Sequence, residues 1–119
     1  MSELQQEWDG EIVRKWLESR FNASRIDQDR ADRGGRSCEG DYDKAAAEEW
    51  VCRALRTSDA TNDRARFADA LKGLLDQDDY LRVGVHDERR FEREVRGYLR
   101  KLVKMTKTNT GFGNRLHHQ

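Results

Sequence analysis

The residues whose spacing points most clearly to a chemical role are six cations near the end of the chain, set three or four positions apart. They are Arg89, Arg93, Arg96, Arg100, Lys104 and Lys107. On an α-helix, which turns by about 100° per residue, these side chains fall within a stripe about 80° wide and about 27 Å long. Glu92 and Glu94 fall beside the stripe and do not interrupt it. A row of like charges repels itself and is typical of a surface that binds a polyanion.

The polyanion most often bound by such a surface is a nucleic acid. The cations are expected to contact its phosphates rather than its bases. Two residues beyond the stripe are expected to add to it. Phe112, between two glycines, would stack on a base or insert into a partner, and Arg115 would meet a further phosphate. Two alternatives stay open. In the first, the cations of the stripe form ion pairs with acidic residues of the same fold or of a neighbouring subunit. In the second, they are exposed to solvent and bind no partner.

The charge is balanced over the whole chain but unbalanced along it. Lys and Arg together number 23, as do Asp and Glu. Residues 1–60 hold 10 basic and 14 acidic side chains, whereas residues 61–119 hold 13 basic and 9 acidic ones. The prediction of a polyanion-binding surface therefore depends on local arrangement and not on net charge.

Helices are predicted to position these residues, in a chain without a single proline. Apolar residues at helical spacing predict four helices, over about 2–21, 41–57, 57–76 and 87–107. Their expected N-terminal caps are Ser2, Asp41, the polar run 57–59, and Asp87. Residues 22–40 have one large aliphatic side chain and a Gly-Gly pair, which predicts a long loop, or a fifth helix if residues 25–32 form a helical turn.

The chain is therefore expected to be all-α, with one helical domain over residues 1–107, a small bundle of four or five helices, and a flexible tail over 108–119. Residues 80–85 alternate like a strand but have no partner strand. They are expected to form an ordered connector that packs Leu81, Val83 and Val85 onto the core. The chain has three tryptophans, Trp8, Trp16 and Trp50, which is more than a core of this size needs. One of them is therefore available for a protein interface.

Several classes of protein are disfavoured by what the sequence lacks. No apolar run approaches the ~18 residues of a membrane span, and no export signal begins the chain. Cys38 and Cys52 are then expected to be free thiols in a reduced, cytoplasmic setting. The acidic run 76–79 lacks the spacing of a calcium loop, and His86 lacks a partnered nucleophile. We therefore expect no enzyme activity, metal or cofactor.

Together these features predict a non-enzymatic accessory subunit of a larger nucleoprotein complex, which contacts other protein subunits and the backbone of RNA or DNA. In size and charge layout the chain resembles the small helical subunits of CRISPR effector complexes, which implies a role in antiviral defence. The alternative is a protein-binding inhibitor or adaptor, of a phage anti-defence or antitoxin-like kind. That protein would act through the acidic flank of the first helix or through residues 22–40. A third hypothesis is a homo-oligomer in which the basic last helix of one copy packs against the acidic first helix of a neighbouring copy.

Overall fold

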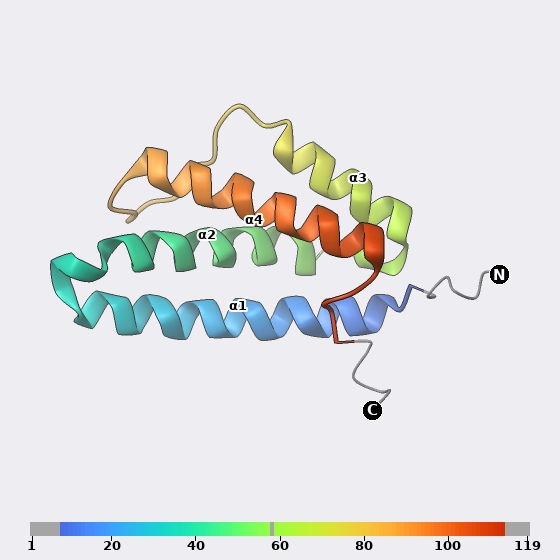
Figure 1. Cartoon of the computed structure of the whole chain (residues 1–119), viewed down its shortest axis with the longest axis horizontal. Coiled ribbons are helices and arrows are strands. Elements are labelled where there is room, and N and C mark those ends of the chain that lie inside the picture. The colour runs from blue at the N-terminus through green and yellow to red at the C-terminus, as the bar shows by residue number, and fades with distance from the viewer. Residues whose placement is uncertain (1–7, 58, 114–119) are drawn as a thin grey trace.

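The computed structural model describes residues 8–57 and 59–113, and it consists of helices and their connections (Figure 1). Its four α-helices are α1 (Gly10–Arg33), α2 (Glu39–Arg56), α3 (Arg64–Leu75) and α4 (Glu88–Thr108). Short 3-10 helices lie at Gly35–Cys38 and Asp59–Asn62, and none of the described residues forms a strand. The prediction of a small all-α bundle with four helices is confirmed.

The centre of the bundle is α2. It packs against α1 on one side and against α4 on the other, and α3 packs on α4 (Figure 1). The large side chains of the common core come from all four helices and are almost fully buried: Leu17, Leu55, Phe67, Leu71, Phe91 and Leu99. Within the described ranges, no helix is both long enough and apolar enough to cross a membrane.

The first helix starts later and ends later than the sequence pattern predicts. Asp9 is its N-cap, because the carboxylate accepts hydrogen bonds from the N–H groups of Glu11 and Ile12 at 3.0 and 3.2 Å. The predicted cap, Ser2, lies outside the described residues. The helix then continues to Arg33, so the predicted loop over residues 22–40 is wrong.

The extension of α1 depends on small and polar residues that face α2. Ser24, Gln28 and Ala31 are buried and continue the apolar row of the helix at its own spacing. Their polar atoms are satisfied: the Ser24 hydroxyl donates to the carbonyl of Phe21 at 2.7 Å, and the Gln28 amide donates to Glu49 at 2.8 Å. A search for large aliphatic side chains cannot detect such a face.

The third helix also starts later than predicted. Residues 59–62 form a 3-10 turn, and Asp63 caps α3 by accepting from the N–H of Ala65 at 2.8 Å. The turn packs on the start of α1, where the indole N–H of Trp8 donates to the carbonyl of Thr61 at 2.7 Å. A side chain at Gly10 would place its Cβ 2.5 Å from that same carbonyl oxygen, so the close approach of the two segments requires glycine there.

The connector between α3 and α4 is ordered by contacts other than those predicted. Tyr80 is buried and packs its ring edge-on against Trp50. Leu81 and Val83 are exposed instead of packing on the core, and of the three predicted contacts only that of Val85 is present. The connector is therefore fixed by Tyr80 and by polar groups, which leaves two large apolar side chains in solvent.

Candidate nucleic-acid interface

The start of α4 is fixed by two carboxylates. Asp87 caps the helix as predicted, accepting from the N–H of Arg90 at 3.1 Å. Asp43, fully buried on α2, accepts from the backbone N–H groups of His86 and Asp87 at 2.8 and 2.9 Å and from Nε of Arg90 at 3.2 Å. Because these bonds join α2 to the first turn of α4, they set the orientation of the whole helix.

Two opposite faces divide α4. The face on the core contains Phe91, Val95, Leu99 and Leu102, all buried. The outer face carries five exposed cations, which we call the cation face: Arg89, Arg93, Arg100, Lys104 and Lys107. They occupy one unbroken helix from Glu88 to Thr108, so the predicted length of about 27 Å applies to the observed helix.

Neutralisation within the fold does not account for the cation face. Among residues 8–57 and 59–113, no carboxylate forms an ion pair with any of its five side chains. Like charges one helical turn apart repel each other by a few tenths of a kcal/mol per pair. The repulsion therefore persists in the isolated chain and would be relieved by an external anion.

Arg96, the sixth predicted cation, has a different environment. Its guanidinium donates to the carbonyls of Gln77 and Asp78 at 3.2 and 3.3 Å and lies 4.8 Å from the ring centroid of Tyr80. It also pairs with Glu92 at 3.7 Å. Arg96 therefore joins α4 to the connector, and we leave it out of the cation face.

The prediction that Phe112 is available to stack on a base is wrong. Its side chain is only 2 % exposed and makes edge-on ring contacts with Trp8, Trp16 and Phe67. Gly111 and Gly113, at φ 91° and 95°, allow the turn that returns the chain to the core. The folded domain thus extends past residue 107, at least to Gly113. Arg115, the other predicted addition, lies outside the described residues.

The three tryptophans are partly buried and belong to the edge of the core. Trp8 and Trp16 contact Phe112, and Trp50 contacts Tyr80. These contacts within the fold explain all three residues as packing groups, and their use at a protein interface stays a prediction.

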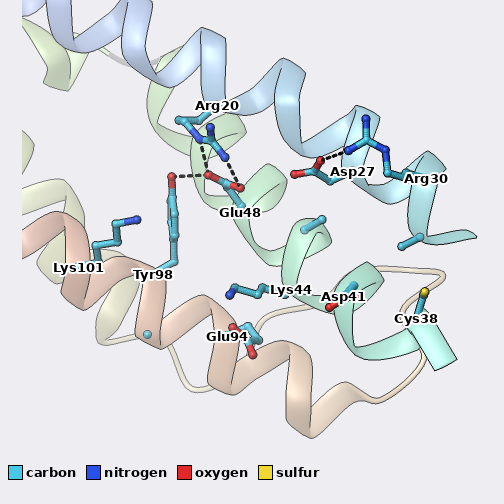
Figure 2. Close-up of a pocket in the computed structure, with 13 residues that line it drawn as sticks. Arg20, Asp27, Arg30, Cys38, Asp41, Lys44, Glu48, Glu94, Tyr98 and Lys101 are labelled. Carbon is cyan, nitrogen blue, oxygen red and sulfur yellow. Dashed lines mark hydrogen bonds and ion pairs between the residues drawn. The ribbon is translucent and has the colours of Figure 1, made fainter. Parts of the chain in front are cut away.

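A groove of about 720 Å³ lies beside α4, between α1 and α4 and above α2 (Figure 2). The residues that line it include the small residues Ala31, Ala45 and Gly97. Its charged lining residues carry both signs: Arg20, Arg30, Lys44, Lys101, Asp27, Asp41, Glu48 and Glu94. Because the two signs balance, the groove has no preference for anions comparable to that of the cation face.

The polar centre of the groove is a hydrogen-bonded cluster around Glu48. Arg20 donates to both carboxylate oxygens, at 2.8 and 3.2 Å, and the Tyr98 hydroxyl donates at 2.9 Å (Figure 2). Behind it, burial raises the pKa of the Cys52 thiol to about 12, and burial also raises the pKa of Tyr98. A thiol this hard to ionise is a poor nucleophile. The cluster joins three helices, and its groups are occupied by one another.

The structure also shows where the acidic residues of the first helix lie and whether acidic side chains gather into a metal site. The acidic flank predicted for the first helix consists of Glu7, Glu11 and Glu18, of which Glu7 lies outside the described residues. Glu11 pairs with Lys15 at 3.8 Å and Glu18 with Arg56 at 3.0 Å, so both described acids of the flank have basic partners. Within the described ranges, no three His, Cys, Asp or Glu side chains are grouped closely enough to hold a metal ion.

Sequence reasoning missed Asp43, Glu48 and Gly97, which lie inside helices. The composition around Asp43 and Glu48 gave no signal, because their partners are 28 to 50 residues away in the sequence. At Gly97 no atom of the fold lies within 4 Å of where a Cβ would be, so no packing pattern marks the position. No protein-family model matches the chain, and neither a curated protein nor a solved structure is detectably similar to it.

Proposed function

We propose that the chain binds the sugar-phosphate backbone of a nucleic acid through the cation face of α4, as an accessory subunit of a nucleoprotein complex. The observation that carries this proposal is the row of five exposed cations that lack a carboxylate partner among the described residues. Each phosphate that meets such a cation releases condensed counterions, which makes binding favourable and dependent on salt.

The spacing along α4 suits a regular polyanion. Successive members of the cation face lie about 6, 10, 6 and 4.5 Å apart along the helix axis, at about 1.5 Å per residue. A nucleic-acid backbone offers phosphates at comparable intervals along its whole length. The cations project from a helix whose orientation Asp43 fixes. Binding therefore has to order only the cation side chains themselves, and the further cost in conformational entropy is small.

The placement of the aromatic residues argues against stacking on unpaired bases. The chain has three Trp, three Tyr and four Phe, and every one lies in the described part of the chain. None of these ten side chains is exposed. Stacking platforms for unpaired bases require exposed rings. The proposed contact therefore involves no stacking on bases and is assigned to the phosphates.

A glycine at the edge of the cation face supports a close approach of the ligand. Gly97 lies between Arg93 and Arg100 in the sequence and is exposed. A Cβ at this position would meet no atom within 4 Å, so packing within the fold does not require glycine. Glycine inside a helix costs about 1 kcal/mol relative to alanine. The missing side chain removes steric bulk beside Arg93 and Arg100, which would let a phosphate chain approach the helix more closely there.

The test is a binding titration with a matched charge control. A labelled duplex of arbitrary sequence, about 24 base pairs long, is titrated with wild type and with the variant Arg93→Glu/Arg100→Glu/Lys104→Glu, and fluorescence anisotropy is recorded. The control, Lys15→Glu/Arg33→Glu/Arg36→Glu, changes the net charge equally but places the changes on α1 and the turn after it.

We expect the cation-face variant to bind at least about a hundredfold more weakly than wild type, and the control to stay within about threefold. Circular dichroism checks that both variants keep their helices. Equal losses in both variants would show that net charge alone drives binding and would contradict a specific cation face. Absence of binding by folded wild type at low salt would contradict the proposal altogether.

A further inference from the structure

The cation face is divided into two groups of charges along α4. The first group, the N-terminal pair, consists of Arg89 and Arg93, which lie about 6 Å apart along the helix axis. The second group, the C-terminal trio, consists of Arg100, Lys104 and Lys107 and covers about 10 Å of the axis. A gap of about 10 Å separates the two groups. The surface therefore offers two places for phosphates and a space between them.

The middle of α4, within this gap, is unfavourable for a phosphate. The exposed residue of the outer face there is Gly97, which has no side chain to offer. Arg96 is engaged with the connector, because it pairs with Glu92 at 3.7 Å and donates to the carbonyls of Gln77 and Asp78 at 3.2 and 3.3 Å. The carboxylate of Glu92 and the exposed residue Asp78 are thus held beside the gap. A chain of phosphates that followed the whole outer face would have to pass these negative charges.

An unpaired strand and a duplex would meet this surface differently. An unpaired strand is a single chain of phosphates, and proteins that hold it combine cations with exposed aromatic rings on which its bases stack. None of the ten aromatic side chains of this protein is exposed. A duplex instead presents two rows of phosphates, one from each strand, on the two sides of a groove. Two groups of cations with a gap between them match the second arrangement.

The size of the gap selects one groove of B-form DNA. The minor groove, about 6 Å wide, fits within the gap of about 10 Å, whereas the major groove, about 12 Å wide, exceeds it. The helix cannot enter a major groove, because α2 and α3 pack against it and leave only a strip of its surface exposed. The minor groove of an RNA duplex is wide and shallow, so its two rows of phosphates lie farther apart.

We infer that the ligand of the cation face is double-stranded DNA, and that α4 bridges its minor groove. The N-terminal pair contacts the phosphates of one strand, and the C-terminal trio contacts those of the other. Gly97 then lies over the groove, where the absence of a side chain lets both rows of phosphates reach the cations on either side. This inference rests on the proposed function, since it names the nucleic acid that the same surface binds.

The first experiment compares three ligands by fluorescence anisotropy over a range of salt concentrations. They are a DNA duplex of about 24 base pairs, one of its strands, chosen not to fold on itself, and an RNA duplex of the same sequence. At about 100 mM salt, wild type should bind the DNA duplex at least about tenfold more tightly than either of the others. The salt slope for the single strand should be no steeper than about −2, because the C-terminal trio then makes three contacts of about −0.7 each.

The second experiment removes cations from one group at a time. Arg89→Ala/Arg93→Ala should weaken binding of the DNA duplex at least about tenfold, but should change binding of the single strand by less than about threefold. The reason is that a single strand engages the C-terminal trio alone. The matched variant Lys104→Ala/Lys107→Ala has the same net charge and should weaken binding of both ligands.

Two controls accompany these variants. Lys15→Ala/Arg33→Ala removes the same number of charges from exposed positions of α1 and should leave binding of both ligands within about threefold of wild type. Circular dichroism checks that every variant keeps its helices. Alanine favours the helix, so these substitutions at exposed positions should preserve it.

The bridged minor groove is contradicted if Arg89→Ala/Arg93→Ala weakens binding of the single strand and of the DNA duplex by the same factor. It is also contradicted if the single strand or the RNA duplex binds wild type as tightly as the DNA duplex does. In either case nucleic-acid binding itself still stands. If folded wild type binds none of the three ligands, the proposed function fails, and this inference fails with it.

Discussion

Arg96 lies over the ring of Tyr80, with 4.8 Å between its Cζ atom and the ring centroid. This contact, with the two carbonyls that the same guanidinium reaches, separates Arg96 from cations one turn away on the same helix. Sequence spacing treats Arg96 and Arg100 as equivalent, whereas the fold gives the first an internal partner and leaves the second exposed.

The two arginines should therefore respond differently to the same substitution. Arg96→Ala should lower the free energy of unfolding by about 1 kcal/mol through lost hydrogen bonds and ring contact, and should change duplex affinity little. Arg100→Ala should leave stability within about 0.5 kcal/mol and reduce the salt slope of binding by about one unit. Urea unfolding and anisotropy titrations measure the two effects. If Arg96→Ala and Arg100→Ala had the same effects on stability and on duplex binding, the different roles assigned to the two arginines would be contradicted.

Phe112 should be one of the most important residues for stability, although it lies beyond the last helix. Phe112→Ala should lower the free energy of unfolding by about 3–5 kcal/mol, because it empties a site lined by Trp8, Trp16 and Phe67. Denaturant unfolding followed by tryptophan fluorescence measures the loss. The control Thr110→Ala changes an exposed residue of the same segment and should cost far less. A small loss for Phe112→Ala would mean that the segment is not docked.

Stability should fall in acid partly through Glu49. Burial raises the pKa of this carboxyl, but hydrogen bonds from Gln28 and Arg82 outweigh it and set the pKa below the usual 4.5. A lowered pKa in the folded state adds stability above the unfolded pKa, and that stability is lost as pH falls through the folded value. Glu49→Gln should be less stable than wild type at pH 7, and the difference should shrink below about pH 4.5.

Urea unfolding from pH 7 down to about pH 3 measures this effect for wild type and Glu49→Gln. Asp69→Asn, at an exposed position of α3, serves as the control. A difference between wild type and Glu49→Gln that stays constant with pH would show that Glu49 makes no contribution through its charge.

Gly97 and Gly73 provide a matched pair for the proposed close approach of the ligand. Both are exposed inside helices, and a Cβ at either would meet no atom within 4 Å. Gly97→Ala and Gly73→Ala should each raise the free energy of unfolding by about 0.8–1.0 kcal/mol. Only Gly97→Ala should weaken duplex binding. Unchanged affinity in both variants would remove Gly97 from the interface.

The sequence was sufficient to predict α4 and its two faces. Its apolar residues recur at strict helical spacing, Asp87 gives a clear start, and the cations occupy the opposite side. These are local properties, and local properties are what periodicity detects. The exposure of Arg89 and Arg100 follows from the same pattern.

The remaining features depend on contacts between distant segments. Gln28 looks like a loop residue in the sequence, yet it lies in α1 because Glu49 and Arg82 satisfy its amide. Phe112 resembles an exposed tail residue, yet the aromatic side chains around it are Trp16 of α1, Phe67 of α3 and Trp8, which lies two positions before α1. The partner that decides such a residue's place is known only once the fold is known.

The most direct test of the nucleic-acid proposal is the salt dependence of duplex binding by wild type and by Arg93→Glu/Arg100→Glu/Lys104→Glu. Each phosphate contacted contributes about −0.9 to the slope of log affinity against log salt, so five contacts set a limit of about −4.5. We expect wild type to give a slope between about −3 and −4.5, and the variant to lose most of it. A wild-type slope near zero, or an equal slope in the variant, would contradict the cation face as the binding surface.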